Sequence, residues 1–198
     1  MKLCECADNI FLGYNRSAVN QNIVNPRVHE YKLLTISSMK SGFIYTKEIN
    51  DNEKYASNIE IDPKYFTKKD DIIICCKQPY NMVLIKRDEE KNILIPSNFV
   101  VIRDSNIDVD YLYNYLRIKL NEFLRYKREN SKVEKQSDNI SKADVEDIEI
   151  SIPKKSLAKL STVLKRINNR QSLYNNLINN DEELIITLLR KEGVIEND

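Results

Sequence analysis

Glycine is scarce in this chain of 198 residues, which contains only three, and the net charge is close to zero at +1. So few glycines exclude low-complexity segments and the Gly-rich loops that hold phosphate groups. A small net charge creates no overall field, so any site for a polyanion must be a local cluster of Lys and Arg. The sequence also lacks an apolar run near 18 residues and an apolar signal-peptide core after Met1. We therefore expect a soluble, cytoplasmic protein.

Residues that commonly bind metals are also few. The single histidine, His29, belongs to no pattern of neighbouring ligands. The four cysteines occur as Cys4 with Cys6 and as adjacent Cys75 and Cys76, without the Cys-x-x-Cys pairs of zinc ribbons. In an intracellular protein such cysteines are expected to be reduced thiols in strands. We expect neither a metal nor a cofactor.

The strongest periodic pattern lies between residues 157 and 188. Alternate steps of three and four residues from Leu157 reach apolar or aromatic side chains, except at Gln171 and Asp181. This heptad pattern is typical of a helix that buries one stripe against another helix. Such a helix is about 46 Å long at 1.5 Å per residue, with a weak point at Asn179–Asp181. The residues expected at a dimer or subunit interface are Leu157, Leu160, Leu164, Ile167, Gln171, Tyr174, Ile178, Ile185 and Leu188.

Several short segments before this helix have the composition of strands. The continuous apolar run Ile72–Cys76 predicts a strand that is buried on both faces, and Phe99–Arg103 predicts another. Met82–Ile85 and Ile93–Ile95 flank the polar turn Arg87–Asn92, which favours a hairpin. Alternation and β-branched residues predict a further strand at 31–36, whereas the polar residues at 47–58 indicate a loop.

A helix follows the last of these strands. Asp110 is positioned to cap a helix over residues 111–126, where apolar side chains recur at helical spacing. Residues 140–147 indicate a short helical turn, and 148–153 indicate an alternating strand that ends at Pro153. The predicted fold class is α+β. A mostly β domain with a flanking helix occupies residues 1–153, and a long coiled-coil helix occupies residues 154–198.

Motifs in a particular order cover nearly the whole chain. They are the entry segment Lys2-Leu3 with Gly13, the stretch from Ile61–Lys64 to Asp71–Ile74, Ile95–Arg103, Tyr111–Leu116, and the exit Ile140–Pro153. Each motif is weak alone, but their order before a heptad helix is fairly specific. Together they resemble the specificity subunit of type I restriction–modification systems, with one target-recognition domain and one conserved helical region.

This resemblance implies a DNA sequence-specificity subunit that reads half of a bipartite site in double-stranded DNA. It implies partners in the form of methyltransferase and endonuclease subunits, and no catalysis by the chain itself. Full-length members carry two recognition domains and two helices, whereas this chain has one of each and no internal repeat. We therefore expect a homodimer, or pairing with another half-subunit, through antiparallel helices. A two-fold dimer would read inverted half-sites.

Polar and basic positions in loops beside the strands are the candidates for contacts with DNA. Phosphate contacts favour Lys or Arg, and base edges are read by Arg, Asn or Gln. The candidate residues are Arg16, Ser17, Lys40, Lys47, Lys77, Gln78, Tyr80, Asn81, Arg125, Lys127, Arg128, Lys132 and Lys135. The last five belong to a basic connector, and Lys77–Asn81 forms a compact loop with a cation, an amide and a ring.

Two other classes of function stay open at this point. The heptad helix and the near-neutral charge are also compatible with a coiled-coil interaction module that has no affinity for DNA. A small metal-dependent nuclease is the third possibility, because Asp71 precedes the acid-x-lysine spacing of Glu89 and Lys91. Glu89 and Lys91 lie in a run of charges, for which a solvated turn is the simpler explanation.

Overall fold

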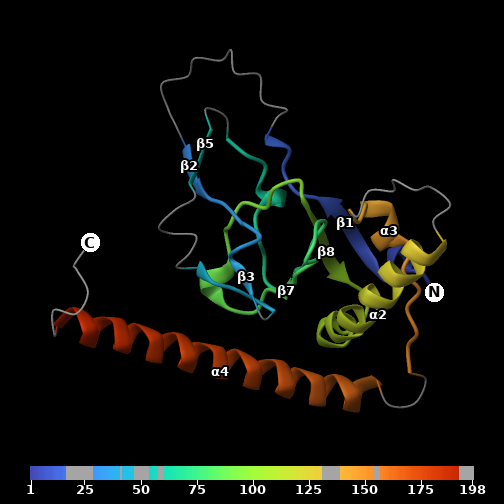
Figure 1. Ribbon diagram of the computed structural model, residues 1–198. Coiled ribbons are helices and arrows are strands. Elements are labelled where there is room, and N and C mark those ends of the chain that lie inside the picture. The colour runs from blue at the N-terminus through green and yellow to red at the C-terminus, as the bar shows by residue number, and fades with distance from the viewer. Residues whose placement is uncertain are drawn as a thin grey trace. The chain divides into compact units, whose positions relative to one another are not determined.

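The structure is a computed structural model that describes residues 1–16, 29–40, 42–46, 54–57, 60–130, 139–153 and 157–191 (Figure 1). For residues 126–130, 176, 179, 181–183 and 185–191 it describes the backbone alone. The chain divides into two units, Met1–Ile152 and Pro153–Asp198. Among the residues described, no helix combines the length and the apolar character needed to cross a membrane.

A four-stranded antiparallel sheet forms the centre of the first unit. Its strands are β1 (Ala7–Leu12), β6 (Ile72–Cys75), β7 (Met82–Leu84) and β8 (Phe99–Ser105), in the order β1-β8-β6-β7. Every residue of β6 is buried, as the continuous apolar run predicts, because both faces of the sheet are covered. The strand expected at Phe99–Arg103 is also confirmed and extends to Ser105.

Different elements cover the two faces of this sheet. On one face, Ile72 and Ile74 pack in a core with apolar side chains of α2 (Val109–Asn130) and α3 (Lys142–Glu146). On the other face, Ile73 packs with residues from loops and from two short strands, β3 (Met39–Lys40) and β4 (Phe43–Ile44). Figure 1 shows α2 and α3 together beside β1 and β8.

Two smaller antiparallel pairs complete the strands. The strands β3 and β4 are joined by a turn at Gly42, whose φ of 86° suits glycine. The strands β2 (His29–Lys32) and β5 (Lys54–Ser57) place Tyr31 opposite Tyr55. The predicted strand at 31–36 therefore begins earlier and ends at Lys32. The prediction of a loop throughout 47–58 is wrong at β5, whose partner strand lies far away in the sequence.

The hairpin predicted across Arg87–Asn92 is also wrong. A short 3-10 helix, η4 (Asp88–Glu90), occupies this segment, and β7 pairs only with β6 among the strands described. The carboxylate of Glu90 is fully buried and accepts hydrogen bonds from the backbone N–H groups of Ile44, Lys86 and Arg87. A buried acceptor thus organises the turn, which the polar composition of the segment does not reveal.

The helix α2 begins at Val109, two residues before the predicted start at Tyr111. The Asp108 carboxylate accepts a hydrogen bond from the backbone N–H of Tyr111 at 2.9 Å, so Asp108 fills the capping role expected of Asp110. Asp110 is instead buried and lies 3.2 Å from the ammonium group of Lys86. Two further 3-10 helices, η1 (Leu3–Glu5) and η3 (Pro63–Tyr65), connect other segments.

The segment between α3 and the second unit is less regular than predicted. Ser141 caps α3 and accepts a hydrogen bond from the Asp144 backbone N–H. Ile148 and Ile150 are buried, in agreement with the alternating pattern. The expected strand at 148–153 is reduced to an isolated bridge between Lys2 and Glu149.

The second unit contains α4 (Leu157–Lys191), a continuous helix of 35 residues. It passes through Asn179–Asp181 without interruption, so the weak point expected there does not end the helix. The sheet domain and the helix confirm the predicted α+β class. Pairing of α4 as a coiled coil stays a prediction.

Candidate nucleic-acid interface

One end of the central sheet brings together segments that are distant in the sequence. In the antiparallel register, Leu12 lies opposite Val100, Cys75 opposite Phe99, and Ile74 opposite Met82. The carboxyl ends of β1 and β6 therefore meet the amino ends of β7 and β8 at this edge. The segments that extend from these strand ends carry Arg16 and the loop Lys77–Asn81. We call this edge the polar end of the sheet.

The loop Lys77–Asn81 is a tight turn between β6 and β7. The Tyr80 backbone N–H donates to the Lys77 carbonyl oxygen at 2.8 Å, and the Cys75 N–H donates to the Asn81 carbonyl oxygen at 2.8 Å. Tyr80 is half-buried and packs against the core on the α2 face, whereas Lys77 and Gln78 are exposed. The turn thus holds its backbone in place and exposes a cation beside an amide.

A side-chain hydrogen bond joins this turn to β3. The Asn81 amide nitrogen donates to the Met39 carbonyl oxygen at 2.6 Å, across 42 positions of sequence. Lys40 follows Met39, is exposed, and has its ammonium group 5.6 Å from the centre of the Tyr45 ring. Lys40 is therefore held next to the turn that carries Lys77.

Backbone hydrogen bonds also connect the start of the Arg16 segment to the polar end. The Tyr14 N–H donates to the Ile95 carbonyl oxygen, and the Ser97 N–H donates to the Tyr14 carbonyl oxygen at 2.9 Å. The Cys76 N–H donates to the carbonyl oxygen of Asn98 at 2.9 Å, which extends the connection to the turn after β6. Gly13 is essential to this ladder, because a Cβ there would lie 2.1 Å from the Pro96 carbonyl oxygen.

The segment that follows the predicted basic connector also reaches this edge. The Ile140 N–H donates to the Cys76 carbonyl oxygen at 2.8 Å, directly before Lys77. Arg125 is exposed near the carboxyl end of α2, and Lys127 and Arg128 belong to the same helix, which replaces the first part of the expected connector. The remaining candidates Ser17, Lys47, Lys132 and Lys135 lie outside the described residues.

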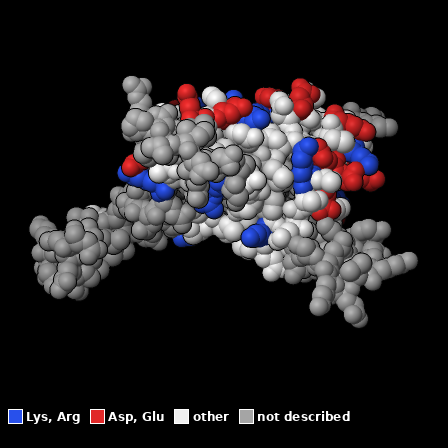
Figure 2. All heavy atoms as spheres, turned by 90° about the horizontal axis from the view of Figure 1, so that it is seen from above, with Lys and Arg blue, Asp and Glu red and all other residues white. Residues whose placement is uncertain are grey.

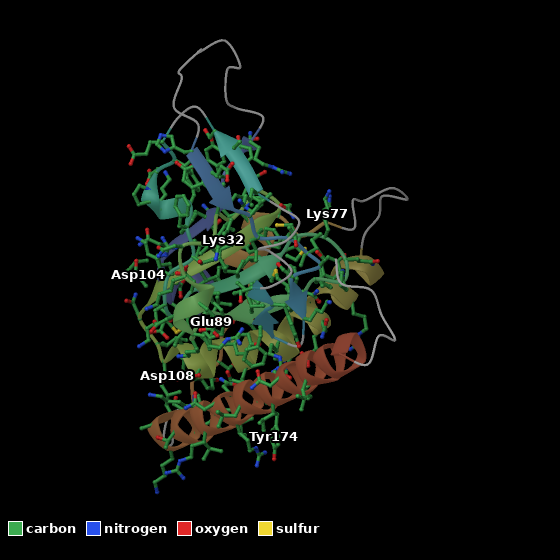
Figure 3. The ribbon with its side chains drawn as sticks, turned by 90° about the vertical axis from the view of Figure 1, so that its left-hand side faces the viewer. Lys32, Lys77, Glu89, Asp104, Asp108 and Tyr174 are labelled. Atoms are coloured by element: carbon green, nitrogen blue, oxygen red, sulfur yellow. The ribbon has the colours of Figure 1, made fainter. Side chains whose placement is uncertain are left out.

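The charges differ between the two ends of the sheet. Neither Arg16 nor Lys77 forms an ion pair with any residue that the structure describes. Lys77 lies across the sheet domain from Asp104 and Asp108 (Figure 3). Towards that opposite end, Lys86, Arg87, Lys91 and Arg103 are paired with carboxylates, whereas Lys68 and Lys69 are exposed and form no ion pair with a described residue.

Elsewhere the described surface carries both signs of charge. On the face drawn in Figure 2, Lys and Arg lie among Asp and Glu, and acidic side chains gather towards the top and right-hand edges. Because the net charge is only +1, any surface that attracts a polyanion must be confined to a small cluster of Lys and Arg.

Two further polar residues lie at the same edge and were missed by the sequence-based selection. Asn15 and Ser97 are exposed next to the hydrogen-bonded Tyr14. Both occur in polar segments at strand ends, where turn residues concentrate. Turn composition is thus the only signal in the sequence that would have identified them.

The three residues considered for a nuclease have separate partners. Asp71 is fully buried and accepts hydrogen bonds from the Arg103 Nε and Nη2 atoms, both at 2.7 Å. Glu89 lies 3.4 Å from Arg87, and Lys91 lies 2.5 Å from Asp88. Burial raises the pKa of Asp71, an effect that the Arg103 guanidinium opposes. Within the described ranges, no group of three His, Cys, Asp or Glu residues could hold a metal ion.

The helix α4 supplies the other candidate surface. Of the expected interface residues, Leu160, Gln171, Tyr174 and Ile178 are exposed, and Leu157, Leu164 and Ile167 are intermediate. Only the backbone is described at Ile185 and Leu188. Further apolar side chains are exposed at Val163, Leu173, Leu177 and Leu184.

No protein-family model matches the chain, and no curated protein matches it either. Among solved structures, the chain is similar to the HsdS subunit from Thermoanaerobacter tengcongensis, with 18% identity and a TM-score of 0.48. The match covers 96% of this chain but only 48% of the HsdS subunit, so the chain spans about half of that protein. HsdS is the name of the type I specificity subunit, the family that the sequence motifs resemble.

Proposed function

We propose that this chain is a DNA sequence-specificity module of a type I restriction–modification system. It reads one half of a bipartite site in double-stranded DNA and recruits methyltransferase and endonuclease subunits. The chain itself performs no chemistry and needs no cofactor in this proposal. Support comes from the ordered motifs that lead to a heptad helix and from the side chains gathered at the polar end of the sheet.

The observation that carries the proposal is the convergence of separate segments on that edge. Arg16, Lys40 and Lys77 come from three different parts of the chain, and hydrogen bonds join their neighbourhoods to the sheet. Arg16 and Lys77 form no ion pair with any described residue, so they can bind phosphate groups without first breaking one. Exposed amides beside them can reach base edges. A rigid sheet edge that carries both types is suited to reading duplex DNA.

Each residue has a distinct part in this proposal. Arg16 and Lys77 contact phosphates and set the position of the domain on the duplex. Gln78 faces the bases. Asn81 and Tyr80 hold the turn, because one is bonded to Met39 and the other packs against the core.

Neutralising Arg16 and Lys77 tests the proposal. In the double variant Arg16→Gln/Lys77→Gln, we expect weaker binding to a random pool of duplex DNA. The slope of log K against log salt should fall by about 2, about 1 for each lost phosphate contact. Fluorescence anisotropy at several salt concentrations measures both quantities.

The control variant for this experiment is Lys119→Gln. Lys119 is partly exposed on α2, away from the polar end of the sheet in sequence, and is paired with Glu122 at 2.5 Å, so its loss should leave the salt slope unchanged. Equal slopes for the wild type and the double variant would contradict the proposed interface. Absence of binding even at low salt would favour the coiled-coil interaction module, and metal-dependent cleavage by the purified chain would favour the nuclease.

The apolar stripe of α4 extends the proposal to assembly. We propose that a second copy of this chain, aligned antiparallel, covers the stripe and fixes two recognition domains a set distance apart. Large apolar side chains exposed over several turns favour a protein partner over water. The seam repeats with one period over most of the helix, so it can pair with its own copy, as a two-fold axis requires.

A charged pair in this stripe tests self-association. Tyr174 and Ile178 are 60% and 54% exposed and lie one helical turn apart. We expect the wild type to sediment as a dimer and the variant Tyr174→Glu/Ile178→Glu to sediment as a monomer, because each introduced carboxylate would have to be buried in the seam. The control Asn169→Glu changes an exposed position on the opposite side of the heptad and should leave the dimer intact. A monomeric wild type at high concentration would contradict the pairing.

A further inference from the structure

We infer that Gln78 is a specificity-determining residue that reads adenine in the major groove of the target DNA. The inference rests on the DNA-binding function proposed above and adds the base that one side chain recognises. It follows from the way the turn Lys77–Asn81 is held and from the one free amide that this turn exposes.

The backbone on both sides of Gln78 is fixed to the sheet. On the β6 side, the N–H and carbonyl groups of Cys76 are bonded to Asn98 and Ile140. On the β7 side, the Asn81 carbonyl oxygen accepts from Cys75 and the Asn81 amide donates to Met39. The turn between them is closed by the bond from the Tyr80 N–H to the Lys77 carbonyl oxygen. Gln78 therefore projects from a loop with little freedom to rearrange on binding.

Tyr80 contributes to the same rigidity through an unusual backbone conformation. Its φ is 55°, in the left-handed region that a residue with a Cβ seldom occupies. Its half-buried ring packs against the core on the α2 face, which holds the residue in that conformation. Strain of this kind persists where the surrounding structure enforces it, and it is concentrated at ligand-binding positions.

Gln78 itself has the chemistry of a base reader. It is exposed, and its amide forms no hydrogen bond with any residue in the described ranges. A glutamine amide offers a donor and an acceptor side by side, which match N7 and the N6 amino group of adenine. Lys77 is next to it and exposed, so a phosphate contact can place the amide at the base edge. Lys77 alone provides only a point charge, whereas Gln78 can discriminate between bases.

Selection from a random duplex library tests this inference with variants of one position. The wild-type chain should enrich sites with adenine at one position by about 5- to 150-fold over the other bases, the range of a bidentate contact. Gln78→Arg should change the preference at that position from adenine to guanine, because the Arg fork matches O6 and N7 of guanine. Gln78→Ala should accept all four bases there and leave the other positions of the site unchanged.

The matched control is Asn169→Arg, which adds the same charge at an exposed amide residue on the side of α4 away from the heptad stripe. It should retain the wild-type site. A wild type that enriches no site would overturn the proposed function itself. An enriched site whose adenine position is unaffected by Gln78→Arg and Gln78→Ala would leave that function standing and overturn this inference. Weaker binding with the same base preference would also overturn it, because Gln78 would then contact only the DNA backbone.

Discussion

Replacing Asp71 with alanine is expected to lower the free energy of unfolding by about 3–5 kcal/mol, because it leaves a buried cation without its partner. Asp71 is fully buried, and its two carboxylate oxygens accept hydrogen bonds from Arg103 at 2.7 Å. Arg103 also donates to the carbonyl oxygens of Lys64 and Phe66, so its guanidinium cannot turn towards water without losing those bonds. Urea denaturation followed by circular dichroism measures the change.

The control for this prediction is Asp88→Ala. Asp88 is fully exposed and pairs with Lys91, so its loss should not measurably shift the midpoint of urea denaturation. Similar midpoints for Asp71→Ala and the wild type would contradict the structural role assigned to the Asp71–Arg103 pair. That outcome would reopen the nuclease hypothesis, in which Asp71 needs access to a metal ion.

The same pair makes a prediction about pH. In Arg103→Met the Asp71 carboxylate stays buried without its guanidinium partner, and burial already raises its pKa in the intact protein. A folded-state pKa above the unfolded value means that folding takes up a proton. The contribution of Asp71 to the free energy of unfolding is therefore fully present below the pKa of this group in the unfolded chain. It is lost as the pH rises through the pKa of Asp71 in the folded protein. The stability lost in Arg103→Met should be larger at pH 8 than at pH 5, and an equal loss at both would contradict this account.

Replacing Gly13 with alanine is expected to destabilise the domain by about 3 kcal/mol or more, the upper part of the range for overpacking. A Cβ at this position would lie 2.1 Å from the Pro96 carbonyl oxygen and 2.4 Å from the Ile95 carbonyl oxygen. Both obstacles belong to the backbone, so relief requires the chain itself to move. The Tyr14–Ile95 and Ser97–Tyr14 hydrogen bonds would be displaced, and DNA affinity should fall because Arg16 follows this ladder.

Gly42 provides the comparison for this substitution. A Cβ at Gly42 would lie 2.5 Å from the Tyr113 hydroxyl oxygen, and the next atom is 3.8 Å away. Gly42→Ala should therefore regain part of its lost stability when combined with Tyr113→Phe, leaving the cost of its positive φ. Gly13→Ala has no such rescue, because the atoms that its Cβ would clash with are the backbone carbonyl oxygens of Ile95 and Pro96, which no side-chain substitution removes. A melting temperature of Gly13→Ala equal to that of the wild type would contradict this packing.

Several elements could be predicted because their signal is local. The continuous apolar run at Ile72–Cys76 predicts a buried strand from that segment alone. The heptad over Leu157–Leu188 predicts an amphipathic helix in the same way. The structure accordingly has β6 and α4 at these places. By contrast, β5 was missed because Lys54–Ser57 becomes a strand only when β2, more than twenty residues earlier, pairs with it. The turn at Arg87–Asn92 was misread because Glu90 looks like a solvated charge until its buried partners are known.

The sequence by itself determined the α+β class, the buried strands and the existence of one long amphipathic helix, because each depends on the period of apolar residues within a single segment. It also provided the ordered motifs on which the proposed DNA-reading function rests. Only the tertiary structure decided which polar residues meet. Asp71 and Arg103 pair across 32 positions, and Asn81 reaches Met39 across 42. Such contacts depend on how strands align in space, and no local pattern of residues encodes that alignment.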